Sequence, residues 1–134
     1  MPARLAIAIT LATAVAGCSR EETLSPPEAR AGVDACAACG MMLADTRFAG
    51  ALAVREGGLV ERRVYDDIGE MLAVPPPAAE HAFYVVAFDT GAWVEADDAT
   101  YVHAPSVMTP MATGVVAFSS ADAADAFARE HAGV

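Results

Sequence analysis

Residues 59–72 read Leu-Val-Glu-Arg-Arg-Val-Tyr-Asp-Asp-Ile-Gly-Glu-Met-Leu, and in this stretch a strand pattern passes directly into the start of a helix. The first half, up to Tyr65, follows a turn signal and is typical of a β-strand. Asp67 then occupies the position of a helix N-cap, and Glu70 three residues later completes a pair that resembles a capping box. Pro75, Pro76 and Pro77 end the helix, because proline lacks an amide donor and crowds the preceding turn.

Apolar patterning predicts further strands on both sides of this stretch. Residues 47–54 carry large apolar side chains at alternate positions, which suits a strand, and the turn signal Glu56-Gly57-Gly58 joins them to the strand that follows. Residues 82–88 form a near-continuous apolar run that is typical of a buried strand.

The second half of the chain repeats this order more faintly. Short strands are predicted at 92–95, 100–103 and 114–118. Ser119 and Ser120 then cap a helix that ends near Gly133. Both 59–72 and 114–127 read as strand, aromatic residue, two small polar capping residues and amphipathic helix. This repetition predicts two copies of a β-β-α unit.

The order of elements predicts an α+β fold with small antiparallel sheets. We expect one compact domain over residues 34–134, divided into two half-repeats at about 34–89 and 90–134.

The first 33 residues are predicted to lie outside this domain. Residues 1–17 combine a basic start, a short apolar run and small residues before Cys18, which is typical of a secretory signal peptide. A cysteine directly after Ala-Gly resembles the bacterial lipobox, which implies lipidation of Cys18; the alternative is an ordinary signal followed by a buried or free cysteine. Residues 18–33 are polar and contain proline, so we expect a flexible tether.

Charge and hydropathy restrict the partners. The net charge is −10, and nucleic acid is a poor partner because phosphate binding needs clustered cations. After the signal, no apolar segment is long enough to span a bilayer, so we expect a periplasm-facing protein held to the membrane by its lipid. Under the enterobacterial sorting rule, Ser19 favours the outer membrane over the inner.

Residues 36–42, Cys-Ala-Ala-Cys-Gly-Met-Met, place two thiols and two thioethers within seven positions. Thiolate and thioether sulfur atoms are soft donors, and that pairing selects Cu(I) over hard ions. Met108 and Met111 form a second methionine cluster near the other end of the chain. Methionine usually fills gaps in a core, and Met71 is interpreted in that way.

Two other interpretations of Cys36 and Cys39 stay open on these residues alone. In an oxidising compartment a close cysteine pair forms a disulfide by default, which would make the protein a structural lipoprotein with a stapled loop. The pair could also belong to a thiol-disulfide oxidoreductase, although no long helical pattern follows it. A structural zinc site would need two further ligands, and no other cysteine is available once Cys18 carries lipid.

Three segments together resemble the NosL family of lipoproteins, which bind copper during maturation of nitrous oxide reductase. They are Cys39-Gly40-Met41, the stretch from Tyr65 to Met71, and Met111 shortly before the last predicted strand. The resemblance covers essentially the whole chain after the signal. It implies two β-β-α-β units of treble-clef-like character that hold one Cu(I) through soft ligands.

The same resemblance implies the ligands. The Cys-Gly-Met of the family corresponds to Cys39 and Met41, and its later methionine corresponds to Met111. Met108 is a candidate to assist, and Cys36 is a candidate ligand, redox partner or structural residue. His103 is a weaker nitrogen candidate, since a solitary histidine in a strand is more often packed or exposed. Asp66 and Asp67 are interpreted first as helix caps.

These expectations define the predicted function. We expect a membrane-anchored periplasmic Cu(I) chaperone, without catalytic activity, that passes copper to a membrane transporter of the ABC type or its accessory complex. The copper would then reach nitrous oxide reductase or its assembly factors.

Overall fold

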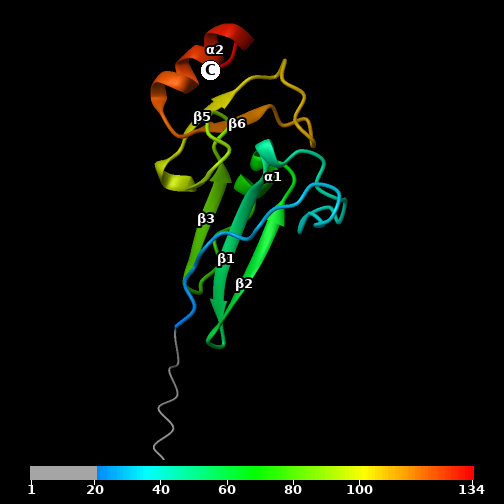
Figure 1. Cartoon of the computed structure of the whole chain (residues 1–134), viewed down its shortest axis with the longest axis vertical. Coiled ribbons are helices and arrows are strands. Elements are labelled where there is room, and N and C mark those ends of the chain that lie inside the picture. Colours follow the sequence, from blue (N-terminus) through cyan, green and yellow to red (C-terminus); the bar gives the residue numbers. More distant parts are fainter. Residues whose placement is uncertain (1–20) are drawn as a thin grey trace, which may run out of the picture.

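The computed structural model describes residues 21–134, and the predicted signal peptide and lipidated Cys18 lie outside them. The elements of the chain, in order, are η1 (Thr46–Phe48), β1 (Gly50–Glu56), β2 (Leu59–Tyr65), α1 (Ile68–Leu72), β3 (His81–Val86), β4 (Trp93–Glu95), η2 (Ala96–Asp98), β5 (Thr100–His103), β6 (Val115–Phe118) and α2 (Ala121–His131) (Figure 1). Here η marks a 3-10 turn. The predicted α+β fold with small antiparallel sheets is confirmed.

Two antiparallel sheets carry the fold. One has four strands in the order β2-β1-β3-β4, and the other pairs β5 with β6. The small sheet and α2 lie at one end of the molecule, and the β1–β2 hairpin lies at the other (Figure 1). The first unit is β1-β2-α1-β3, and the second is β5-β6-α2.

Strand β4 does not follow the predicted division of the chain at residue 90. It lies after that residue, but it pairs in the sheet of the first half. Its Val94 lies opposite Val85 of β3. The cause is a tight turn after β3, in which Gly91 has a φ of +69° and its N–H donates to the carbonyl of Ala87 at 2.7 Å. This turn reverses the chain within a few residues, so β4 pairs with the nearest open edge.

Local sequence signals account for the other elements of the first unit. Glu56 of β1 lies opposite Leu59 of β2, which leaves a two-residue loop of Gly57 and Gly58. Both glycines have positive φ, as the preferred hairpin turn requires. The predicted strand at 47–54 begins later than expected, because Asp45 accepts a bond from the N–H of Arg47 and so caps η1.

Strand β1 is buried on both faces. On one face Leu52 packs in the core that contains Ile68 and Met71 of α1. On the other, Ala51 and Ala53 are fully buried under the N-terminal segment. The core role predicted for Met71 is confirmed.

The N-terminal strap, residues 21–29, covers that second face. Leu24 packs on the cluster that contains Ala51, Ala53 and Tyr84, and the Tyr84 hydroxyl donates to the Leu24 carbonyl. Residues 18–33 were expected to be a flexible tether; from residue 21 the structure instead lays them along the sheet. The small alanines of β1 leave room for this chain and apolar surface for it to cover.

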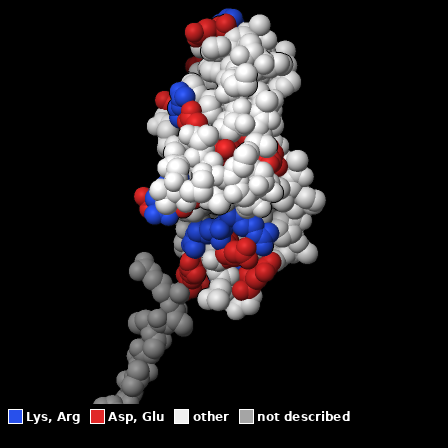
Figure 2. Space-filling view, turned by 90° about the vertical axis from the view of Figure 1, so that its right-hand side faces the viewer, with Lys and Arg blue, Asp and Glu red and all other residues white. Residues whose placement is uncertain are grey.

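Arginine side chains also hold the strap. Arg62 binds Glu22 at 2.7 Å and donates to the carbonyls of Ser25 at 2.9 Å and Thr23 at 3.1 Å. Arg55 donates to the carbonyl of Glu22 at 2.8 Å. Figure 2 shows basic and acidic side chains gathered toward the lower end of the molecule. Among residues 21–134, no helix has the length and apolar character needed to cross a membrane.

Candidate metal centre

Cys36 and Cys39 lie in a tight turn whose backbone closes on itself. The Gly40 N–H donates to the Cys36 carbonyl at 2.8 Å, and the Cys36 N–H donates to the Met41 carbonyl at 2.8 Å. Gly40 has a φ of +74°, a conformation that glycine adopts without steric cost. One short loop, the cysteine turn (residues 36–41), therefore presents both sulfur atoms.

A carboxylate from α1 joins the two thiols. Ligand atoms of Cys36, Cys39 and Glu70 all lie within 4.8 Å of one another, close enough to share a metal ion. Cys36 donates a hydrogen bond from Sγ to Glu70 Oε2 at 3.1 Å. Cys36 is buried, Glu70 is half-buried and Cys39 is exposed, so the group extends from the core to the surface. Both cysteines are free thiols.

Glu70 belongs to the candidate site, and the sequence pattern assigned its side chain to a different contact. The predicted capping box with Asp67 is wrong, because the Glu70 carboxylate bonds to Cys36. Asp67 does cap α1, as predicted, by accepting from the Gly69 N–H at 2.9 Å. A contact between residues 34 positions apart leaves no local pattern. Its one signal was the position of Glu70 inside the stretch that resembles NosL.

The surroundings of Cys36 raise the pKa of its thiol. Burial disfavours the thiolate, and the hydrogen bond to Glu70 acts in the same direction. Backbone N–H groups of Asp66, Cys39 and Ala38 oppose the shift by donating to the sulfur. Cys36 is therefore protonated at neutral pH without metal, and an ion that binds its thiolate must displace that proton.

The donors fit a soft metal ion. Two thiols supply most of the group, and thiolates select Cu(I), zinc or iron–sulfur clusters over hard cations such as Mg²⁺. Met41 and Met42 follow in the same loop with 51% and 50% of their surface exposed. Met42 pairs with Ala35 in an isolated antiparallel bridge, which fixes the base of the loop.

Met111 lies in the connection between β5 and β6, residues 104–114. Its backbone N–H donates to Asp67 Oδ2 at 3.0 Å, and Asp67 caps the helix that carries Glu70. The structure thus brings the Met111 segment and the cysteine turn to one short helix, α1 (Figure 1). The half-buried thioether of Met111 remains a predicted ligand.

The two weaker candidates are both exposed. Met108 lies in the same connection as Met111 and has 84% of its surface exposed. His103 ends β5, where its backbone pairs with that of Val134 at 2.7 and 3.0 Å. His103 does not belong to the group formed by Cys36, Cys39 and Glu70.

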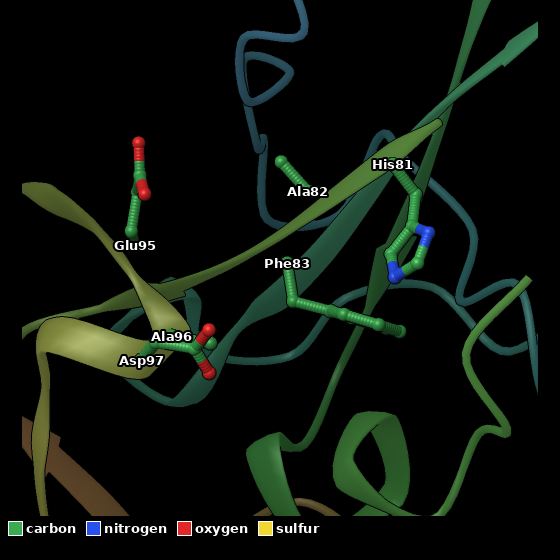
Figure 3. Close-up of a pocket in the computed structure, with 6 residues that line it drawn as sticks. All are labelled: His81, Ala82, Phe83, Glu95, Ala96 and Asp97. Carbon is green, nitrogen blue, oxygen red and sulfur yellow. The ribbon is translucent and has the colours of Figure 1, made fainter. Parts of the chain in front are cut away.

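A separate hollow of about 150 Å³ lies beside β3 and β4. Its lining residues are His81, Ala82, Phe83, Glu95, Ala96 and Asp97 (Figure 3). The Glu95 carboxylate points away from both His81 and Asp97 in Figure 3. The polar groups of this hollow therefore do not converge on a common ligand position, and the cysteine site is the candidate metal centre.

Comparison with known proteins identifies the family of the chain. The model of the NosL family matches residues 29–134, which include the cysteine turn, α1 and Met111. A search of curated proteins found no match to the chain. Since the family model spans most of the sequence, the chain belongs to the NosL family of copper-binding proteins.

Proposed function

We propose that this protein is a periplasmic Cu(I) chaperone, held to the membrane by lipid on Cys18, that supplies copper for assembly of nitrous oxide reductase. The observation that carries the proposal is the group of Cys36, Cys39 and Glu70, whose ligand atoms lie within 4.8 Å of one another between core and surface. Membership of the NosL family supports copper as the metal.

The donors support Cu(I) as the proposed oxidation state. Cu(I) favours thiolate and thioether ligands, and the cysteine turn offers both types within six residues. Cys39 and Met41 are the proposed first ligands, with Met111 from the loop at 104–114 and Cys36 as a further thiolate. Glu70 is a hard oxygen donor, so its proposed role is to hold the protonated Cys36 thiol in place before Cu(I) displaces its proton, rather than to bind Cu(I).

The exposure of the site suits transfer. Cys39 is exposed and Met41 is half-exposed, so a donor atom of a partner can approach the copper from solvent. Copper then moves by ligand exchange, in which the partner's sulfur or nitrogen enters as a methionine leaves. We propose a membrane transporter of the ABC type or its accessory complex as that partner, and the outer membrane as the site of the anchor.

The oxidoreductase alternative lacks its usual support. In redox proteins of the thioredoxin type, a helix begins at the cysteine pair and its dipole stabilises one thiolate. Within the described residues, the cysteine turn is followed by the bridge at Met42, and η1 begins only at Thr46.

The test is a competitive titration of the reduced protein with Cu(I) against a chelator of known affinity. Cys39→Ser, Met41→Ala and Met111→Ala should each weaken binding by about tenfold or more, the scale seen even for residues that support metal ligands. Met42→Ala is the matched control for Met41→Ala, because the two side chains are equally exposed, and it should bind as the wild type does.

If both Met41→Ala and Met111→Ala bind Cu(I) with unchanged affinity, these methionines are not ligands. Insulin-reductase activity that depends on Cys39 would favour the enzyme instead.

A further inference from the structure

Asp67 is a fully buried carboxylate with four hydrogen-bond donors. Its Oδ1 accepts from the Gly69 N–H at 2.9 Å and from the Thr113 hydroxyl. Its Oδ2 accepts from the Thr109 hydroxyl at 2.6 Å and from the Met111 N–H at 3.0 Å. Three of the four donors belong to the loop at 104–114.

Capping of α1 alone does not explain this arrangement. A helix N-cap needs one acceptor oxygen, which Ser, Thr or Asn also supplies. A buried carboxylate costs desolvation energy unless it is fully paired, and here the second oxygen is used entirely by the loop. Burial raises the pKa of Asp67, but the hydrogen bonds from Thr109 and Thr113 and the backbone keep it below its ordinary value. The group is therefore a carboxylate at neutral pH.

The neighbouring residue fixes the other sulfur-bearing segment. Asp66 Oδ1 accepts from the Ala44 N–H at 2.8 Å, just beyond the cysteine turn, and the Asp66 N–H donates to the Cys36 sulfur. Consecutive aspartates thus hold both segments at the start of α1.

The loop also packs directly on the helix. A Cβ placed on Gly69 would lie 2.5 Å from Thr113 Oγ1 and 2.6 Å from its Cβ, so the Thr113 side chain leaves no room for a side chain at Gly69. Figure 1 shows the β5–β6 connection reaching down beside α1.

We propose that Asp67 is a positioning residue for copper binding, which holds the Met111 loop against the helix that contacts Cys36 before the metal arrives. The inference rests on the proposed function and on Met111 as a ligand. Its physical basis is that an ordered loop avoids the entropy cost of recruiting a flexible ligand at the moment of binding.

Asp67→Asn separates the two roles of the carboxylate, which are to cap α1 and to accept from the Met111 N–H. Asparagine keeps one acceptor oxygen, whereas the N–H groups of Gly69 and Met111 require one oxygen each. If the remaining oxygen caps α1, it also keeps the bond from Thr113, whereas the side-chain amide faces the Met111 N–H. The loop then loses its anchor at Met111 while the helix keeps its cap.

The experiment compares full-length wild type, Asp67→Asn, Met111→Ala and the double variant by competitive Cu(I) titration. Asp67→Asn should weaken binding by about tenfold or more, and the double variant should bind no more weakly than Met111→Ala alone. Asp89→Asn is the control, because Asp89 also joins two segments, by accepting from Ser119 at 3.0 and 2.6 Å, but lies outside the site. It should bind as wild type does.

X-ray absorption of the copper-loaded proteins supplies a readout that general destabilisation would not change. The loss of one sulfur neighbour should occur in both Asp67→Asn and Met111→Ala, and not in Asp89→Asn. If Asp67→Asn does not fold, Thr109→Val takes its place, because it removes a donor to the same Oδ2 while keeping the side-chain shape.

The outcomes separate this inference from the proposed function. Failure of the wild type to bind Cu(I) overturns both. Tight wild-type binding that Met111→Ala does not weaken overturns the positioning role and leaves a copper site at the cysteines. Wild-type affinity and sulfur count in a folded Asp67→Asn, or in Thr109→Val used in its place, also overturns the positioning role.

Discussion

Gly69→Ala should destabilise the protein even though alanine is the better helix former. Gly69 is the second residue of α1, and its added Cβ would lie 2.5, 2.6 and 2.9 Å from three side-chain atoms of Thr113. All three distances are shorter than real Cβ contacts allow. Thr113 cannot simply rotate away, because its own Cβ is one of the three atoms and its hydroxyl bonds to Asp67.

The magnitude follows from three terms. Overpacking costs about 1–3 kcal/mol, and displacement of a hydrogen bond to a carboxylate costs about 1.5–3 kcal/mol. Replacing glycine within a helix returns at most about 1 kcal/mol, and less in the first turn. The strain therefore exceeds the gain, and we expect a net loss of about 2–5 kcal/mol. Each kcal/mol corresponds to roughly 4–8 °C in melting temperature for a domain near this size.

The assay is thermal and urea unfolding of metal-free wild type, Gly69→Ala, and Gly69→Ala combined with Thr113→Gly. The second substitution removes the obstructing atoms, so the loss in the double variant should be less than the sum of the two single losses. A Gly69→Ala protein as stable as wild type, or more stable, would show that the loop at 104–114 does not pack on α1.

Three further predictions address the site and its supports. Glu70→Gln should lower the pKa of Cys36, because the acceptor that raises it loses its charge; the ultraviolet absorbance of the thiolate during a pH titration measures this, and an unchanged midpoint would contradict the contact. Because the pKa of Asp67 is lowered in the folded protein, its carboxylate contributes stability that is fully present at pH values above the ordinary pKa of 3.8 and is lost as the pH falls below 3.8. The unfolding free energies of wild type and Asp67→Asn should therefore converge at acid pH. A difference that stays constant with pH would refute this. Arg62→Ala should loosen the strap, with faster amide exchange at residues 21–29; unaltered exchange there would show that the contacts of Leu24, Tyr84 and Arg55 suffice to hold it.

Local signals predicted much of the fold. The β1–β2 hairpin follows from Gly57 and Gly58, which tolerate the positive φ of a two-residue turn. The start of α1 follows from Asp67, whose side chain reaches the Gly69 N–H. Each of these features is decided within a few residues, where steric and hydrogen-bonding preferences act directly.

Long-range features were missed for the opposite reason. Glu70 fits a capping box by spacing, but a buried thiol 34 residues away in the chain offers it a different partner. The polar, proline-containing residues after Cys18 suggested a tether, yet Arg62 and Leu24 bind them to the sheet. Neither contact alters the local composition, so no pattern in a single sequence could reveal it.

The sequence indicated the type of donor atoms at the candidate site, but not how the segments that carry them are arranged in space. Soft sulfur donors at 36–42 indicated a soft metal, and the structure does bring Cys36 and Cys39 together. The link between Met111 and the same helix depends on Asp67, which the sequence showed only as a cap.

If Cys18 carries the proposed lipid, the strap limits how far the candidate metal centre can move from the membrane. With the proposed lipid on Cys18, three residues, about 10 Å of extended chain, lead to Glu21, where the strap begins. A free tether of 16 residues would allow excursions of roughly 50 Å, whereas the strap binds alongside β1 and fixes the cysteine turn about one strand length, roughly 20 Å, beyond its start. A narrow range of heights above the bilayer raises the effective concentration toward one docked recipient and lowers it toward every other. The distance of the cysteine turn from the bilayer would then help to select which recipient protein receives the copper.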